Sequence, residues 1–170
     1  MLITEDYIAQ NKALHVVSLE YGTGSIRWVD QVTKLCETIG TKDVLDYGCG
    51  KAALVYRMRD EGYSVQGYDP ALEPFAGRPE PADVVVCTDV LEHIEPDCIN
   101  AVLDDLRDLT KKAAFFVVST RPARKVLPDG RNAHLIQAHS NQWLAEFMRR
   151  FVVTQFIATP HGLQAIVLPK

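Results

Sequence analysis

The spacing of apolar residues changes near residue 40 and divides the chain into two parts. Before that point one stretch places its apolar side chains three and four residues apart, as on one face of an amphipathic helix that Gly40 would end. This predicted face consists of Ile26, Val29, Val32, Leu35, Cys36 and Ile39. After residue 40, short apolar runs alternate with helical stretches. We therefore expect one domain over residues 1–170, with a helical cap over 1–40 and a Rossmann-like core over 41–170.

The core pattern predicts the order of its elements. Strands are expected at Val44–Tyr47, Ser64–Tyr68, Asp83–Cys87 and Ala113–Ser119. Helices are expected at Ala52–Glu61, Asp97–Thr110 and Asn141–Arg150, the last with Ser140 as its N-cap. Two final strands, Phe151–Ala158 and Leu163–Leu168, flank a turn. This order predicts an α/β fold, a three-layer Rossmann-like sandwich whose mostly parallel sheet ends in a C-terminal antiparallel hairpin.

Composition and charge narrow the functional classes. The 170 residues carry 18 basic and 22 acidic side chains, a net charge of -4, which argues against a protein that coats nucleic acid through charge alone. The four cysteines stand singly without histidines at zinc spacing, so no metal site is expected. No signal peptide opens the chain and no apolar run approaches the ~20 residues of a membrane span. A cytoplasmic location without membrane contact is expected.

A glycine-containing loop after the first core strand is the most informative motif. Gly48 and Gly50 allow a tight turn into a helix N-terminus, and Asp69 ends the next strand about 20 residues later, where it can accept hydrogen bonds from a ribose. Ala53 in the third glycine position does not exclude a dinucleotide. Asp46 would repel a pyrophosphate, whereas it suits a ligand with a cationic amino group, such as S-adenosylmethionine.

The segment from Asp46 to Ala52 resembles motif I of the class I S-adenosylmethionine-dependent methyltransferases, with alanine in the usual third glycine position. The segment 89–94, Asp-Val-Leu-Glu-His-Ile, resembles the DVLEH signature of the branch that contains the ubiquinone-biosynthesis O-methyltransferases. The resemblance implies S-adenosylmethionine as the cofactor. It implies seven cofactor-binding residues: Asp46, Gly48, Gly50, Asp69, Thr88, Asp89 and Leu91.

The chain departs from this family between its second and third core strands. The family has a helix, a strand and an adenine-binding acidic loop there, whereas this chain has only residues 70–82, with four prolines. Prolines interrupt both helices and sheets, so the resemblance together with this composition predicts a truncated crossover. Leu72, Phe75 and Ala76 would form a helical turn or cap the adenine, or the segment is a plain connecting loop.

The acceptor site is expected in the N-terminal part and the long loop over residues 120–140. That loop contains Arg121 and Arg131, which suit a phosphate, a carboxylate or a nucleic-acid backbone. Tyr21 is a candidate for stacking on a planar acceptor. His134 and His93 are candidate general bases, since a histidine pKa lies near neutrality; as the alternative, either ring caps a helix or satisfies a carbonyl.

These features predict a methyltransferase that acts on an oxygen or nitrogen of a small molecule. Two alternatives stay open: a nucleic-acid or modified-base methyltransferase that uses the basic 121–131 loop, and a degenerate module that binds S-adenosylmethionine without turnover. The second is favoured by the truncated crossover, and the first is weakened because no DPPY or NPPY sequence follows the valine-rich strand. The oligomeric state, monomer or homodimer, is open.

Overall fold

A computed structural model describes residues 1–17 and 22–170. Its helices are α1 (Glu5–Val17), α2 (Val29–Ile39), α3 (Ala53–Asp60), α4 (Ile99–Leu109) and α5 (Ser140–Arg150), with short 3-10 helices η1 (Gly24–Trp28) and η2 (Leu91–His93). Its strands are β1 (Asp43–Tyr47), β2 (Ser64–Tyr68), β3 (Ala82–Thr88), β4 (Thr110–Ser119), β5 (Phe151–Thr159) and β6 (Gly162–Pro169).

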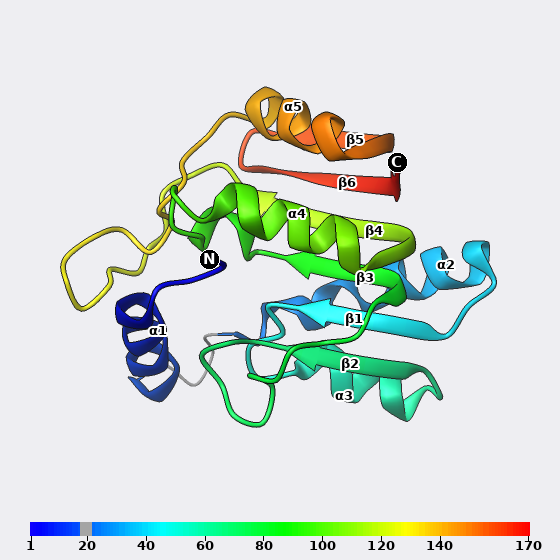
Figure 1. The fold of residues 1–170 in the computed structure, drawn as a ribbon, viewed down its shortest axis with the longest axis horizontal. Helices are drawn as coiled ribbons and strands as arrows, with labels where there is room; N and C mark the ends of the chain where they lie inside the picture. The colour runs from blue at the N-terminus through cyan, green and yellow to red at the C-terminus, as the bar shows by residue number, and fades with distance from the viewer. Residues whose placement is uncertain (18–21) are drawn as a thin grey trace.

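The strands form one sheet in the order β2-β1-β3-β4-β6-β5 (Figure 1). The pairs β1–β2, β1–β3 and β3–β4 are parallel, and the pairs β4–β6 and β5–β6 are antiparallel. The expected α/β sandwich with a closing hairpin is confirmed. The strand β2 lies on one side of β1 and the strands that follow it lie on the other side, so the strand order changes direction between β1 and β3. Open parallel sheets bind their ligands at such a point.

Helices cover both faces of the sheet because alternate strand residues point to opposite sides. One core cluster joins α4 and α5 to Leu45, Val85 and Phe116. The other joins α2 and α3 to Val44 and Val84. Neighbours along β1 and β3 therefore belong to different clusters, as expected for strands that are buried on both faces.

Two local predictions are corrected. Ile26 is 50% exposed, because residues 24–28 form a 3-10 helix and the buried face begins only with α2 at Val29. Ser140 is the first residue of α5 rather than its cap. The N-cap is His139, which forms a reciprocal capping box with Gln142. Both errors lie at helix boundaries, where periodicity carries the least information.

The truncated crossover is confirmed. Residues 69–81 link β2 to β3 without a helix or strand, and turn hydrogen bonds run from Leu72 N to the Asp69 carbonyl and from Phe75 N to the Leu72 carbonyl. The Phe75 ring lies 6.5 Å from that of Tyr56 on α3 and near Gly67 of β2. It therefore packs into the α2–α3 layer instead of capping an adenine.

The N-terminal helix lies at the end of the sheet where the parallel strands finish. Figure 1 shows α1, in dark blue, at the same end of the molecule as the long loop over residues 120–139. Tyr7 and Leu14 of α1 form a small separate core with Leu127 and Ala133 of that loop. Among the residues described, no helix has the length and apolar character needed to cross a membrane.

Candidate functional site

The loop after β1 comes unusually close to the segment that precedes α2. Gly50 has a φ of +51°, and a Cβ atom on it would lie 2.6 Å from the Gly22 Cα and carbonyl oxygen. Lys51 N donates a 2.9 Å hydrogen bond to that same carbonyl. A side chain at position 50 is therefore excluded by sterics as well as by backbone conformation.

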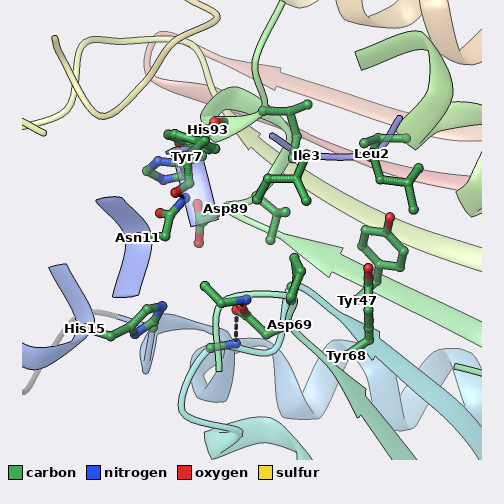
Figure 2. A pocket seen from close by; sticks show the side chains of 18 residues that line it. Leu2, Ile3, Tyr7, Asn11, His15, Tyr47, Tyr68, Asp69, Asp89 and His93 are labelled. Carbon is green, nitrogen blue, oxygen red and sulfur yellow. Dashed lines mark hydrogen bonds between the residues drawn. The ribbon is translucent and has the colours of Figure 1, made fainter. Parts of the chain in front are cut away.

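Asp69 connects this loop to the end of β2. Its Oδ2 accepts a 3.1 Å hydrogen bond from Gly50 N, drawn as a dashed line in Figure 2, and its Oδ1 accepts one of 2.9 Å from Ala71 N. Burial raises the pKa of Asp69, while the two backbone donors and nearby His15 oppose that rise. The carboxylate lines a cavity together with Gly48 and Gly50, as expected for a ribose-binding acid.

Asp46 occupies an energetically costly position below the loop. Its side chain is 1% exposed, and neither carboxylate oxygen has a hydrogen-bond partner within the described residues. Desolvation, and secondarily the charge of Asp69, raise its pKa to about 7. Asp46 does not line either cavity described below, so any attraction to a ligand acts through the loop or through water.

Asp89 follows β3 and stands between two cavities. It has a φ of +55°, its side chain forms an ion pair with Arg27, and burial raises its pKa against the opposing charge of Arg27. The neighbouring candidates differ in position. Thr88 lines the second cavity, whereas Leu91 is fully buried in the α4–α5 core cluster and lines neither cavity, so its contact with the cofactor stays a prediction.

The first cavity is bounded by the strand ends and by the N-terminal segment. Figure 2 shows the α1 side chains Tyr7, Asn11 and His15 on one side and Tyr47 and Tyr68 on the other. The lining also has an apolar part, which includes Leu2, Ala71, Ile94 and Val102. An elongated ligand with a polar centre and one flat apolar end fits this lining.

The second cavity is strongly basic. It encloses about 370 Å³, within the range of small-molecule sites, and opens between η1 and the long loop. Its cationic side chains are Arg27, Arg121, Arg124 and Lys125. It shares Gly22, Gly48, Asp89 and His93 with the first cavity, so the two sites meet at this wall.

Two histidines and one glutamate gather at the wall of the second cavity. The rings of His93 and His134 meet edge to face with centroids 4.7 Å apart. His93 Nδ1 lies 2.7 Å from the Ala133 carbonyl oxygen, and His134 Nδ1 lies 2.6 Å from that of Arg121. Burial, and then His134, lower the pKa of His93 to about 4, while burial raises that of neighbouring Glu92 to about 8.

The predicted acceptor residues fall in different places. Arg121 lines the second cavity. Arg131 lines neither cavity; its guanidinium is paired with Asp129 at 2.6 Å, which leaves it unsuited to the expected contact. Tyr21 lies outside the described residues.

Comparison with known proteins agrees with this geometry. The sequence matches the family described as "Methyltransferase domain" over residues 18–159. The chain belongs to this family. The expected class I superfamily is thereby confirmed, and with it S-adenosylmethionine as the methyl donor. No curated protein matches the sequence at a significant level.

Solved methyltransferase structures share the fold. A Burkholderia thailandensis 1,6-didemethyltoxoflavin-N1-methyltransferase, bound to its acceptor and S-adenosylhomocysteine, is 16% identical with a TM-score of 0.71, covering 100% of this chain and 92% of its own. DhpI bound to S-adenosylhomocysteine is 16% identical, with a TM-score of 0.65 and 98% of each chain covered. The magnesium protoporphyrin IX methyltransferase of Synechocystis is 18% identical, with a TM-score of 0.60, covering 89% of this chain and 87% of its own.

The structure adds residues that the pattern of the sequence did not single out. Glu92 joins the two histidines, and Asn11 and His15 face the first cavity. Asn11 and His15 are four residues apart and therefore lie on the same face of α1. Both are buried polar residues, and this spacing is the signal in the sequence that could have identified them. Glu92 sits inside the DVLEH segment, although that motif does not indicate that its side chain is buried.

Proposed function

We propose that this protein transfers the methyl group of S-adenosylmethionine to an oxygen or nitrogen of a small, anionic acceptor held in the second cavity. The observation that carries the proposal is the shared wall at Gly48, Asp89 and His93. Gly22 also lines both cavities, and a ligand in either one would lie against these shared residues, so that donor and acceptor could meet there. Proximity and orientation of this kind supply much of the rate in a displacement between two bound reactants.

The cofactor residues follow from the first cavity. Asp69 would hold the ribose hydroxyls, and the backbone around Gly48 and Gly50 would face the methionine part. The charge of Asp46 would be offset by the cofactor's cationic amino group, acting through the loop or a water molecule. The adenine would lie in the apolar part by Ile94 and Val102, which provides contact area in place of the acid that other family members use.

The acceptor class follows from the charges of the second cavity. Arg121 and Arg124 lie in its lining and form no ion pair with any carboxylate of the described residues, whereas Arg27 is already paired with Asp89. Guanidinium groups bind carboxylates and phosphates through paired, charge-assisted hydrogen bonds. The concentration of these cations inside a cavity of about 370 Å³ favours a small anion over an extended nucleic-acid backbone.

His134 is the better placed of the two candidate bases. A carbonyl oxygen accepts, so the Nδ1 facing Arg121 must carry the hydrogen, which leaves the Nε2 lone pair to receive a proton from the acceptor. Bound S-adenosylmethionine supplies a methyl group on a positively charged sulfur, and the acceptor's lone pair takes that methyl while the C–S electrons stay on sulfur. The long loop and η1 then serve to shield the reacting atoms from water.

Calorimetric titration with S-adenosylhomocysteine and a labelled-methyl assay over hydroxy acids, phenols and amines carrying a carboxylate or phosphate test this proposal. We expect cofactor binding and turnover on at least one anionic acceptor. An Arg121→Ala variant should raise KM about ten-fold or more without changing cofactor affinity, since one charge-assisted hydrogen bond contributes about 1.5–3 kcal/mol.

The matched control is Arg149→Ala, because Arg149 is exposed on α5 and paired only with Glu146. Equal effects of the two substitutions would remove the acceptor role of Arg121. Cofactor binding without turnover across the panel would favour the degenerate binding module. Tight, salt-sensitive binding of RNA or DNA would favour the nucleic-acid alternative.

A further inference from the structure

We propose that Glu92, His93 and His134 form a binding site for one divalent transition-metal cation at the wall of the second cavity. The cation site stands on its own geometry, and only its role in methyl transfer rests on the function proposed above. No metal was expected from the sequence, because its cysteines have no histidines at zinc spacing. In the folded chain, His134 lies beside Glu92 and His93, which are about forty positions earlier in the sequence.

The geometry of the three side chains fits a metal ligand set. One ligand atom from each of Glu92, His93 and His134 lies within 4.8 Å of the others. Two imidazoles and one carboxylate suit Zn²⁺, Co²⁺, Fe²⁺ and Mn²⁺, and three protein ligands leave coordination positions open for a small molecule. Around a tetrahedral cation with bonds of about 2.1 Å the ligand atoms lie about 3.4 Å apart, so these three atoms would have to approach one another by up to about 1.4 Å, through rotation of their side chains.

Backbone carbonyls orient both histidines in the way that metal sites require. His93 Nδ1 donates to the Ala133 carbonyl at 2.7 Å, and His134 Nδ1 donates to that of Arg121 at 2.6 Å. Each bond selects the tautomer whose lone pair is on Nε2. Ligating histidines almost always donate their other ring N–H to a carbonyl or carboxylate, which aligns the ring and strengthens the ligand.

Glu92 provides the second, independent observation. Its side chain is fully buried, and its Oε1 accepts a 2.9 Å hydrogen bond from Ser119 N. Its Oε2 is buried with no hydrogen-bond partner in the part of the chain that the structure describes. A carboxylate oxygen left in this way destabilises a fold unless a ligand satisfies it. A cation between Glu92 and the histidines would satisfy it.

With such a cation, the second cavity could both bind the acceptor and activate it. Glu92, His93 and His134 line the same cavity as Arg121 and Arg124, so an acceptor could bind such a cation through one oxygen while the guanidinium groups hold its anionic group. A coordinated hydroxyl loses its proton more readily, as metal-bound water does. His134 would then act as a ligand instead of a base, and chelation would distinguish the two roles.

The direct test is titration of chelator-treated protein with Zn²⁺, and with Co²⁺ followed by its visible absorption bands. We expect one ion per chain, with Zn²⁺ displacing Co²⁺. Glu92→Gln and His134→Ala should each weaken Zn²⁺ binding at least about ten-fold, because even indirect support of a metal ligand is worth about that much. His161→Ala is the control, since His161 is exposed in the β5–β6 turn.

Two measurements keep the outcomes separate. Glu92→Gln retains an oxygen for Ser119 N, and binding of S-adenosylhomocysteine by each variant shows that the fold and the cofactor site are intact. No Zn²⁺ binding at about 1 mM, or weakening by His161→Ala equal to that by the ligand variants, overturns the proposed site. Metal binding together with chelator-resistant methyl transfer keeps the site but returns His134 to the role of base. Failure of the wild-type protein to bind S-adenosylhomocysteine would contradict the proposed function but not the metal site.

Discussion

At the scale of single residues, Asp69 links the glycine loop to the first cavity. Its carboxylate accepts hydrogen bonds from the backbone of Gly50 and Ala71 while it lines the first cavity. An Asp69→Asn variant keeps one carbonyl oxygen but loses the charge and one acceptor. We expect it to weaken S-adenosylhomocysteine binding about ten- to hundred-fold, measured by calorimetry, since hydrogen bonds to charged groups contribute about 1.5–3 kcal/mol.

The control for this variant is Asp60→Asn, because Asp60 is exposed at the end of α3 and lines neither cavity. Its affinity should match that of the wild type. Unchanged affinity in the Asp69 variant would show that another residue holds the ribose. A loss of folding, visible in circular dichroism, would instead assign Asp69 mainly to the loop.

At the scale of elements, α1 borders the first cavity, and hydrogen bonds at its N-terminal end attach it to the rest of the fold. Thr4 N and Oγ1 donate to the two carboxylate oxygens of Glu95 at 2.9 and 2.8 Å, and the Tyr7 hydroxyl donates to the His93 carbonyl at 2.5 Å. These contacts join the start of the chain to the segment after β3. Within residues 1–17 and 22–170, α1 also packs into the small core cluster that it forms with the long loop.

Glu95→Ala removes both hydrogen bonds to Thr4 and should weaken the attachment of α1 to the segment after β3 without altering the glycine loop. We expect the dissociation rate of S-adenosylhomocysteine to rise several-fold, because each partly exposed hydrogen bond contributes about 0.5–1.5 kcal/mol. Stopped-flow displacement measures this rate. Glu80→Ala, at an exposed position outside both cavities, is the matched control. Equal rates for all three proteins would mean that α1 does not gate cofactor release.

At the scale of the whole molecule, the buried carboxyl of Asp46 couples stability to pH. Its pKa is about 7 in the folded chain, against an ordinary value of 3.8. Between these values the folded state holds a proton that the unfolded state has lost, so stability falls as pH rises from about 4 to about 7 and then levels off. The full difference is about 4 kcal/mol.

Asp46→Asn should remove the part of this pH dependence that Asp46 contributes, leaving the part from Glu92, and should raise the melting temperature at pH 8, where the wild-type carboxylate is ionised with no hydrogen-bond partner among the described residues. It should also weaken cofactor binding at pH 8, because the charge that offsets the cationic amino group is lost. Thermal denaturation between pH 5 and 8, with and without S-adenosylhomocysteine, measures both effects. A variant less stable than wild type at pH 8 would show that Asp46 has a partner in the folded protein.

The core could be predicted from local pattern because buried strands, the glycine loop and the acid that ends β2 are encoded within a few residues of one another. The residues at which helices begin and end were harder to predict from the sequence. Ile26 fits the helical period, yet it is exposed in a 3-10 helix, and His139 rather than Ser140 caps α5. Periodicity reports which face is apolar, whereas the backbone geometry that ends a helix depends on contacts with neighbouring elements.

The sequence by itself determined the parallel core, the glycine loop, the ribose-binding acid and the truncated crossover. These depend on residue type and short spacing, and they sufficed to indicate the methyltransferase family. Only the tertiary structure decided that Asp46 and Leu91 are buried away from the cavities and that His134 meets Glu92 and His93. Such meetings depend on how the long loop and α1 pack over the strand ends, and no local period encodes that packing.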